Sequence, residues 1–463
     1  MKALIASVAL LLLVGACHHE DTGPGGKWGR TVEPRLTTTR SWHSCTRKLS
    51  PDRVVFDAQC EAEPMLAGRC DEVIDSLQQA DRMLASQPQC TDAAIGALEN
   101  LSRADAAAMS DLAGAYYVRA QRKDNPADLL NAFDAARRAV AVRPLPAGAR
   151  FNYALVLEAL SLNDVAIKAW QSAAETEEYE WASEARAHRA ALMRAMSQDG
   201  VNQWAQVKGR IDTALDTHDV KEARRLLAAF PATSEKYFEE KVLRQWADSP
   251  SPQQLARVKG FAEALSEFFH DHYFNDVALA IDKTRSPERL RQGHLRFAEA
   301  RVEVRSSAAA RLYDAAARLL QRSGSPQYLL ARIGYAAQNA LQTGDYEAAL
   351  RQLETVAAGA RKYPSVIARV ELNRLFHNQY ASHYNNYFAS YDAAKVAYDR
   401  VGDWEDRSAV ASQAVATMSV VGLKKPAWRE AFVAMQNAQR LPSFKMRYLI
   451  TGSTADAALN LGH

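Results

Sequence analysis

Residues 113–146 read AGAYYVRAQRKDNPADLLNAFDAARRAVAVRPLP, and this stretch decides the fold class. Small apolar residues recur with a helical period on both sides of the break at Asn125-Pro126. A shift of 34 residues superposes its alanines on alanines of the stretch 147–180. The paired positions are Ala120 with Ala154, Ala132 with Ala166, Ala135 with Ala169, and Ala139 with Ala173. Small side chains at fixed positions let helices approach closely, so the sequence predicts stacked helical pairs.

The pattern returns further along the chain, most clearly at Ala337, Gly344 and Ala349. A helix–turn–helix unit of 34 residues with small residues at its contact resembles the tetratricopeptide repeat, over about residues 110–430. The resemblance implies an all-α, helical-pair solenoid. It also implies that a protein or peptide partner binds on the concave face of the solenoid.

A narrower resemblance involves residues 151–160, FNYALVLEAL, and residues 166–170, AIKAW. They are similar to the repeat region of bacterial proteins that carry a C-terminal CHAT domain. That domain is a caspase-like protease and needs a His–Cys dyad beyond the repeats. No cysteine follows Cys90, so we do not expect the protease here. A sensor subunit whose protease is a separate chain stays open as an interpretation.

The first residues predict export and a lipid anchor. Met1-Lys2 precedes an uncharged, largely apolar run over 3–14, and small residues stand directly before Cys17. This layout resembles the bacterial lipobox, so we expect a signal peptide over 1–16 and lipidation of Cys17. A plain signal peptide cut near a cysteine is the alternative. The anchor would place the protein in the cell envelope, at the outer membrane facing the periplasm.

The remaining cysteines suggest two disulfides, because an exported protein meets an oxidising space. Three pairings are possible among Cys45, Cys60, Cys70 and Cys90. We favour Cys45–Cys60, which flanks the turn signal at Ser50-Pro51, and then Cys70–Cys90 between two early helices. The spacing contains no Cys-x-x-Cys and does not favour a zinc site.

The expected organisation follows the changes in composition along the chain. Residues 17–26 are polar with glycine and proline and predict a flexible tether. Residues 27–66 predict a small cysteine-containing strand or hairpin segment. The solenoid is expected over 67–441, and residues 442–463 form a cap or tail.

Composition and motifs argue against several classes of function. Of 463 residues, 57 are Lys or Arg and 54 are Asp or Glu, and this net charge of +3 is too balanced for a dedicated nucleic-acid binder. No Gly-x-Ser-x-Gly, His-Glu-x-x-His or phosphate-loop pattern occurs. We therefore expect no catalytic residues, no cofactor and no metal. His270-Asp271-His272 fits a solvated helix end better than a chelating pair.

A tyrosine stripe is the main candidate for partner binding. Its members stand at i, i+4, i+7 and i+11, which predicts one helix face: Tyr380, Tyr384, Tyr387 and Tyr391. Interhelical packing is one interpretation, and a ligand surface is the other, because tyrosine offers a large contact area. We expect Tyr384 to be more buried than Tyr387. Asn152 and Tyr153 are the next candidates on the concave face.

Two functions follow from these expectations. The first is a membrane-anchored interaction scaffold, and the second is an envelope hydrolase, such as a glycan-processing enzyme, whose site is built from the solenoid itself. A groove that holds a carboxyl group of raised pKa favours the hydrolase. A groove lined by tyrosine and asparagine without such a group favours the scaffold.

Overall fold

The computed structural model describes residues 46–50, 53–56, 70, 74–86, 90–102, 105–145, 148–176, 179–197 and 200–463. The predictions for the signal peptide, the tether, Cys17, Cys45 and Cys60 concern residues outside these ranges. The chain forms two compact units, residues 1–192 and 193–463, each considered by itself. Their boundary falls inside the range that the sequence assigned to one solenoid.

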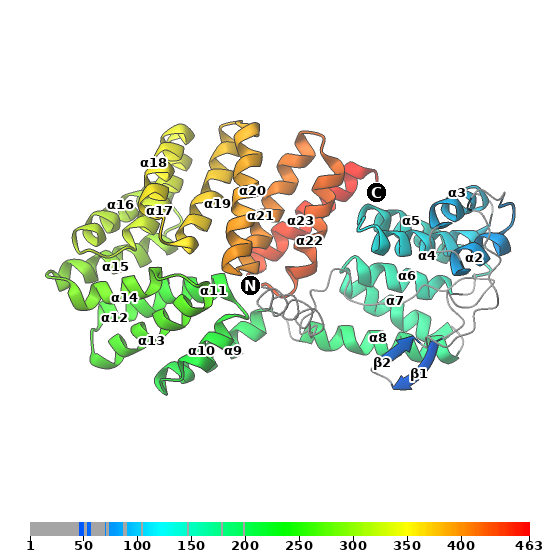
Figure 1. The fold of residues 1–463 in the computed structure, drawn as a ribbon, viewed down its shortest axis with the longest axis horizontal. Coiled ribbons are helices and arrows are strands. Elements are labelled where there is room, and N and C mark those ends of the chain that lie inside the picture. The colour runs from blue at the N-terminus through cyan, green and yellow to red at the C-terminus, as the bar shows by residue number, and fades with distance from the viewer. Residues whose placement is uncertain are drawn as a thin grey trace, which may run out of the picture. The chain divides into compact units, whose positions relative to one another are not determined.

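The N-terminal unit is a short hairpin followed by helices (Figure 1). Strands β1 (Thr46–Ser50) and β2 (Arg53–Phe56) are antiparallel, with Thr46 opposite Phe56, as the turn signal predicted. The helices are α2 (Leu77–Ser86), α3 (Thr91–Leu101), α4 (Ala106–Arg122), α5 (Ala127–Ala141), α6 (Ala149–Ala159), α7 (Asn163–Thr176) and α8 (Tyr179–Ser197), which runs past the boundary.

The C-terminal unit continues the succession of helices. Its first half holds α9 (Gly200–Asp216), α10 (Val220–Leu227), α11 (Pro231–Tyr237), the π-helical turn η2 (Phe238–Val242), α12 (Leu243–Asp248), α13 (Pro252–Phe269), α14 (Tyr273–Lys283) and α15 (Pro287–Val302). Its second half holds α16 (Ser306–Arg322), α17 (Tyr328–Thr343), α18 (Tyr346–Gly359), α19 (Pro364–Tyr380), α20 (Tyr384–Val401), α21 (Trp404–Val420), α22 (Lys424–Ala438) and α23 (Phe444–Leu461).

Consecutive helices pack on one another, which confirms an all-α solenoid of helical pairs. Of the eight alanines that the 34-residue shift aligned, all but Ala169 are buried. Trp170 is fully buried and meets the Phe151 ring edge to face, with centroids 4.9 Å apart. Small residues thus bring the helices together, and the large ring fills the remaining space.

Local signals in the sequence set several helix ends. Ser251 caps α13, because its hydroxyl accepts the backbone N–H of Gln254 at 3.1 Å. Ser251 and Gln254 stand at the spacing of a capping box, but the box is incomplete, since the side-chain oxygen of Gln254 has no hydrogen-bond partner. Gly344 ends α17 in the left-handed region at φ 74°, and Asp345 then caps α18 through the N–H of Ala348.

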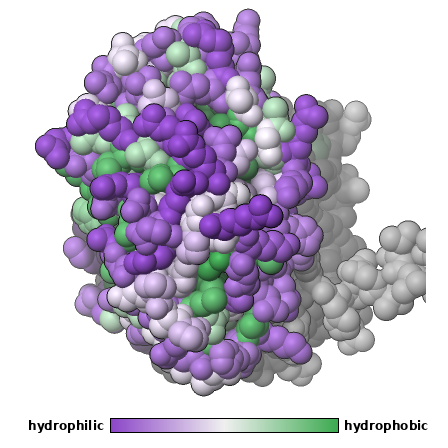
Figure 2. Space-filling model, turned by 90° about the vertical axis from the view of Figure 1, so that its left-hand side faces the viewer, coloured by the Kyte–Doolittle hydropathy of each residue, from purple (hydrophilic) through white to green (hydrophobic). Residues whose placement is uncertain are grey.

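Among the residues that the structure describes, no helix is both long and apolar enough to cross a membrane. On the side of the molecule where Figure 1 places α12–α16, the surface in Figure 2 is mainly hydrophilic, with apolar residues in small separate areas. Scattered apolar residues are ordinary on a folded surface and mark no interface by themselves.

Cys70 and Cys90 form a disulfide across 20 residues, as expected for this pair. Changing both residues to serine should lower the free energy of unfolding by roughly 3 kcal/mol, because the bond restricts the unfolded chain. Chemical denaturation of the oxidised protein and of the double variant measures this difference. Equal midpoints for the two proteins would contradict it.

Candidate binding pocket

A cavity of about 710 Å³ lies in the C-terminal unit. Its lining residues come from helices α9, α11, α15, α16, α17, α19, α20, α21 and α23, from the turn η2 and from the segment between α22 and α23. Five aromatic rings line it, from Trp204, Tyr237, Phe297, Tyr313 and Tyr398. Its charged lining residues are Lys236, Lys241, Arg301, Arg369, Glu240, Glu405 and Asp406. Its size and its mixture of rings and polar groups are typical of ligand-binding cavities.

Helix α11 and the turn η2 present different groups to the cavity and to the interior. Glu235 and Glu239 are buried one helical turn apart. Lys236 and Lys241 line the cavity and are exposed to solvent. A π-helical turn inside an α-helix is rare and is frequent at functional sites.

Two arginines join the acidic residues of this segment to more distant helices. The guanidinium of Arg369 on α19 contacts Glu235 at 2.8 Å and Glu239 at 3.1 Å. The Nε of Arg301 on α15 donates to Glu240 at 3.0 Å. Removing these charges from water is costly, and the pairing offsets that cost. Together with the carboxyl groups of Asp403, Glu405 and Asp406, these residues form an interhelical ion cluster, and several of its members line the cavity.

The cluster has more carboxyl groups than guanidinium groups, and this excess affects their protonation. Burial raises the pKa of Glu235 to about 8 and the pKa of Glu405 to about 7. Burial also raises the pKa values of Asp403 and Asp406, and repulsion between these two carboxyl groups adds to the shift of Asp403. Part of the cluster therefore binds protons near neutral pH.

Glu405 connects two distant parts of the C-terminal unit. Its carboxylate accepts the backbone N–H of Thr233 at 3.0 Å and the Thr233 hydroxyl at 2.6 Å, although the residues are 172 positions apart. Thr233 lies in the first turn of α11, where backbone N–H groups lack helical partners. A residue of α21 thus caps α11 and brings the two helices to the same cavity.

One wall of the cavity depends on a glycine. A Cβ added to Gly334 on α17 would lie 2.6 Å from ring atoms of Tyr313, which is too close for any real contact. The Tyr313 ring therefore packs directly on the α17 backbone. It also meets Phe297 edge to face, with centroids 5.8 Å apart.

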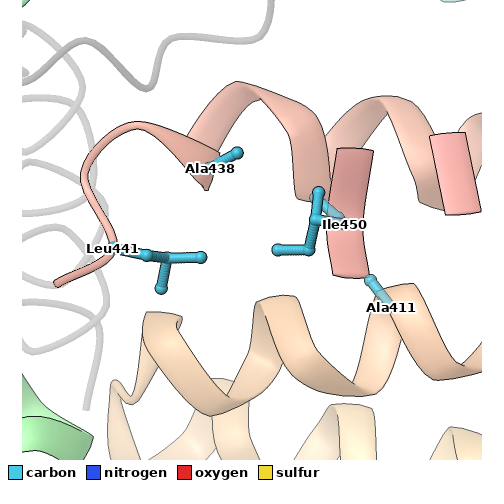
Figure 3. Close-up of a cluster of buried hydrophobic side chains, with 5 residues drawn as sticks. Ala411, Ala438, Leu441 and Ile450 are labelled. Atoms are coloured by element: carbon cyan, nitrogen blue, oxygen red, sulfur yellow. The ribbon is translucent and has the colours of Figure 1, made fainter. Parts of the chain in front are cut away.

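Another part of the lining comes from the last part of the chain. Leu441 and Met446 line the cavity on either side of the start of α23. Leu441 also belongs to a buried cluster with Ala411, Ala438 and Ile450 (Figure 3). Helix α23 thus packs into the core of the C-terminal unit and fixes this part of the lining.

The tyrosine stripe does not form one surface. Helix α19 ends at Tyr380 and α20 begins at Tyr384, because Ser382 turns the chain at φ 60°. Tyr380 is 55% exposed and Tyr384 is 40% exposed, whereas Tyr387 is fully buried. Tyr391 is buried as well. The expectation that Tyr384 is the more buried residue is wrong, since the side chain of Tyr387 is the one that faces α21.

The Tyr387 hydroxyl donates to the carbonyl of Gln413 at 3.1 Å. Changing Tyr387 to phenylalanine should lower the free energy of unfolding by about 1 kcal/mol, because the hydrogen bond between the buried phenol and this carbonyl is lost. Tyr384→Phe is the matched control and should change it by less than about 0.5 kcal/mol. Thermal melting of both variants tests the assignment, and a larger loss at Tyr384 would refute it.

The second pair of candidates lies in the N-terminal unit. Asn152 is buried, and its Nδ2 donates to the carbonyl and the hydroxyl of Ser110 at 3.2 Å. Tyr153 stacks on Phe133 with centroids 6.1 Å apart. Asn152 thus joins α6 to α4 and is not accessible to a partner, because packing places its amide inside.

The histidine pair is separated by a structural aspartate. His270 and His272 are exposed, whereas Asp271 is buried and accepts the N–H and the hydroxyl of Ser365 at 2.8 Å and 2.7 Å. Within the part of the chain that the structure describes, no group of three or more His, Cys, Asp or Glu residues is placed to hold a metal.

Sequence reasoning missed the residues of the cavity, which come from helices far apart in the chain. Glu239-Glu240 and Glu405-Asp406 are visible as acidic pairs, but such pairs are ordinary on exposed helices. No protein-family model matches the chain, and no curated protein matches it.

Proposed function

We propose that this protein is a lipid-anchored interaction scaffold of the bacterial envelope, and that the cavity of the C-terminal unit receives part of a protein or peptide partner. The observation that supports this proposal is the lining of the cavity. Aromatic rings such as Trp204 and Tyr237 are common in recognition sites, because they contribute contact area at a low entropic cost. Cys17 would hold the scaffold at the membrane.

A peptide library displayed on phage tests the proposal. The full chain in detergent should enrich specific peptides, and Ala337→Trp should abolish this enrichment by filling the cavity that Ala337 lines. Ala358→Trp places the same ring at an exposed position of α18 and is the matched control. Melting curves establish that both variants are folded. If the wild-type protein enriches no peptide, or if Ala337→Trp enriches the same peptides, the proposal fails.

An envelope hydrolase is the second candidate, and one observation favours it. Glu405 lines the cavity, and burial raises its pKa to about 7, which is suitable for a general acid. Against this role, its carboxylate already accepts two hydrogen bonds from Thr233. The test is whether the protein releases reducing ends from envelope glycans. If it does, and if Glu405→Gln abolishes this release, the result would support the hydrolase.

A further inference from the structure

The cavity contains two lysines whose charges are not balanced by the ion cluster. Among the residues that the structure describes, neither Lys236 nor Lys241 forms an ion pair. Both are exposed, and both line the cavity together with Tyr237. Free ammonium groups beside an aromatic wall attract anionic groups and are available to donate hydrogen bonds to them.

The acidic residues of the lining are engaged elsewhere. Glu240 is held by Arg301 at 3.0 Å, and Glu405 is held by Thr233. Asp406 is attracted by the Arg369 guanidinium, and burial raises the pKa of its carboxyl group. These carboxyl groups therefore compete only weakly with a ligand for the two lysines. The charges that a ligand meets in the cavity are the positive charges of Lys236 and Lys241.

Building on the proposed function, we infer that the partner segment is an acidic peptide, with carboxylates on Lys236 and Lys241 and an apolar or aromatic side chain in the cavity. Phe297, Tyr313 and Ile333 provide the apolar part of the lining for that side chain. The lysines select the charge of the segment, and the rings bury its central residue. The cavity of about 710 Å³ accommodates one such side chain and its neighbours.

The same peptide selection tests the charge. Peptides enriched by the wild-type protein should carry Asp or Glu beside an apolar or aromatic residue. Lys236→Gln with Lys241→Gln should weaken their binding roughly tenfold or more, because two charge-assisted contacts are lost. Lys424→Gln with Lys425→Gln removes the same charge from exposed positions of α22 and should leave binding unchanged.

The outcomes separate the inference from the proposed function. Enrichment of neutral or basic peptides, or equal binding of acidic peptides by the Lys236/Lys241 variant, would overturn the acidic ligand and leave the scaffold standing. The wild-type protein could instead bind acidic alginate oligosaccharides more tightly than the enriched peptides. If the Lys236/Lys241 variant loses that binding, a peptide is not the ligand. If no peptide is enriched, both proposals are refuted.

Discussion

Arg369→Met should lower the free energy of unfolding of the C-terminal unit by about 3–5 kcal/mol. The guanidinium contacts both Glu235 and Glu239, which are almost completely buried. Its removal leaves the buried Glu235 without its cationic partner, and it leaves Glu239 with only the longer contact to Arg301 at 3.9 Å. Thermal or urea unfolding of the purified protein measures the loss.

Arg296→Met is the matched control for this substitution. Arg296 pairs with Glu299 at 2.7 Å on the surface of α15, where solvent screens the interaction. Its loss should cost less than about 1 kcal/mol. Similar losses for the two variants would show that the buried cluster has no special part in stability. Adding Glu235→Leu and Glu239→Leu to Arg369→Met should restore much of the stability, because apolar side chains replace the buried carboxyl groups.

Stability should fall as pH rises from about 4.5 to about 8, with the Glu235 carboxyl contributing on the order of 4 kcal/mol. Burial raises the pKa of Glu235 in the folded state from an ordinary 4.5 to about 8. Between these values the folded protein holds a proton that the unfolded chain has released. This contribution is complete below pH 4.5 and is lost as pH passes through the folded pKa.

Unfolding by urea at a series of pH values measures this dependence. Glu235→Gln should reduce the slope, because the amide does not titrate, while Glu405, Asp403 and Asp406 keep their raised pKa values. Glu299→Gln, at a half-exposed position of α15, should leave the slope unchanged. Rising stability over this pH range, or an unchanged slope in Glu235→Gln, would contradict the assignment of the proton to the cluster.

The sequence by itself determined the secondary structure and the pairing of helices. Ala154 and Ala166 recur at the spacing of a helical pair and are buried, and Trp170 fills the space between helices. The pairing of β1 with β2 followed from an equally local signal, and the Cys70–Cys90 disulfide belongs to the pairing that the sequence favoured among three. Periodicity, turn residues and cysteine spacing act over short stretches, so they can be read along the chain.

Only the tertiary structure decided where the candidate site lies. Tyr380 and Tyr387 share a spacing that predicts one face, but the turn at Ser382 assigns them to different helices. Thr233 and Glu405 are 172 residues apart and meet because the successive helices of the C-terminal unit bring α21 back to α11. Small differences in the packing of successive helices accumulate over such a distance. The final position of α21 relative to α11 therefore cannot be predicted from any local sequence pattern. For this reason the buried carboxyl groups and the cavity beside them become visible only in the folded molecule.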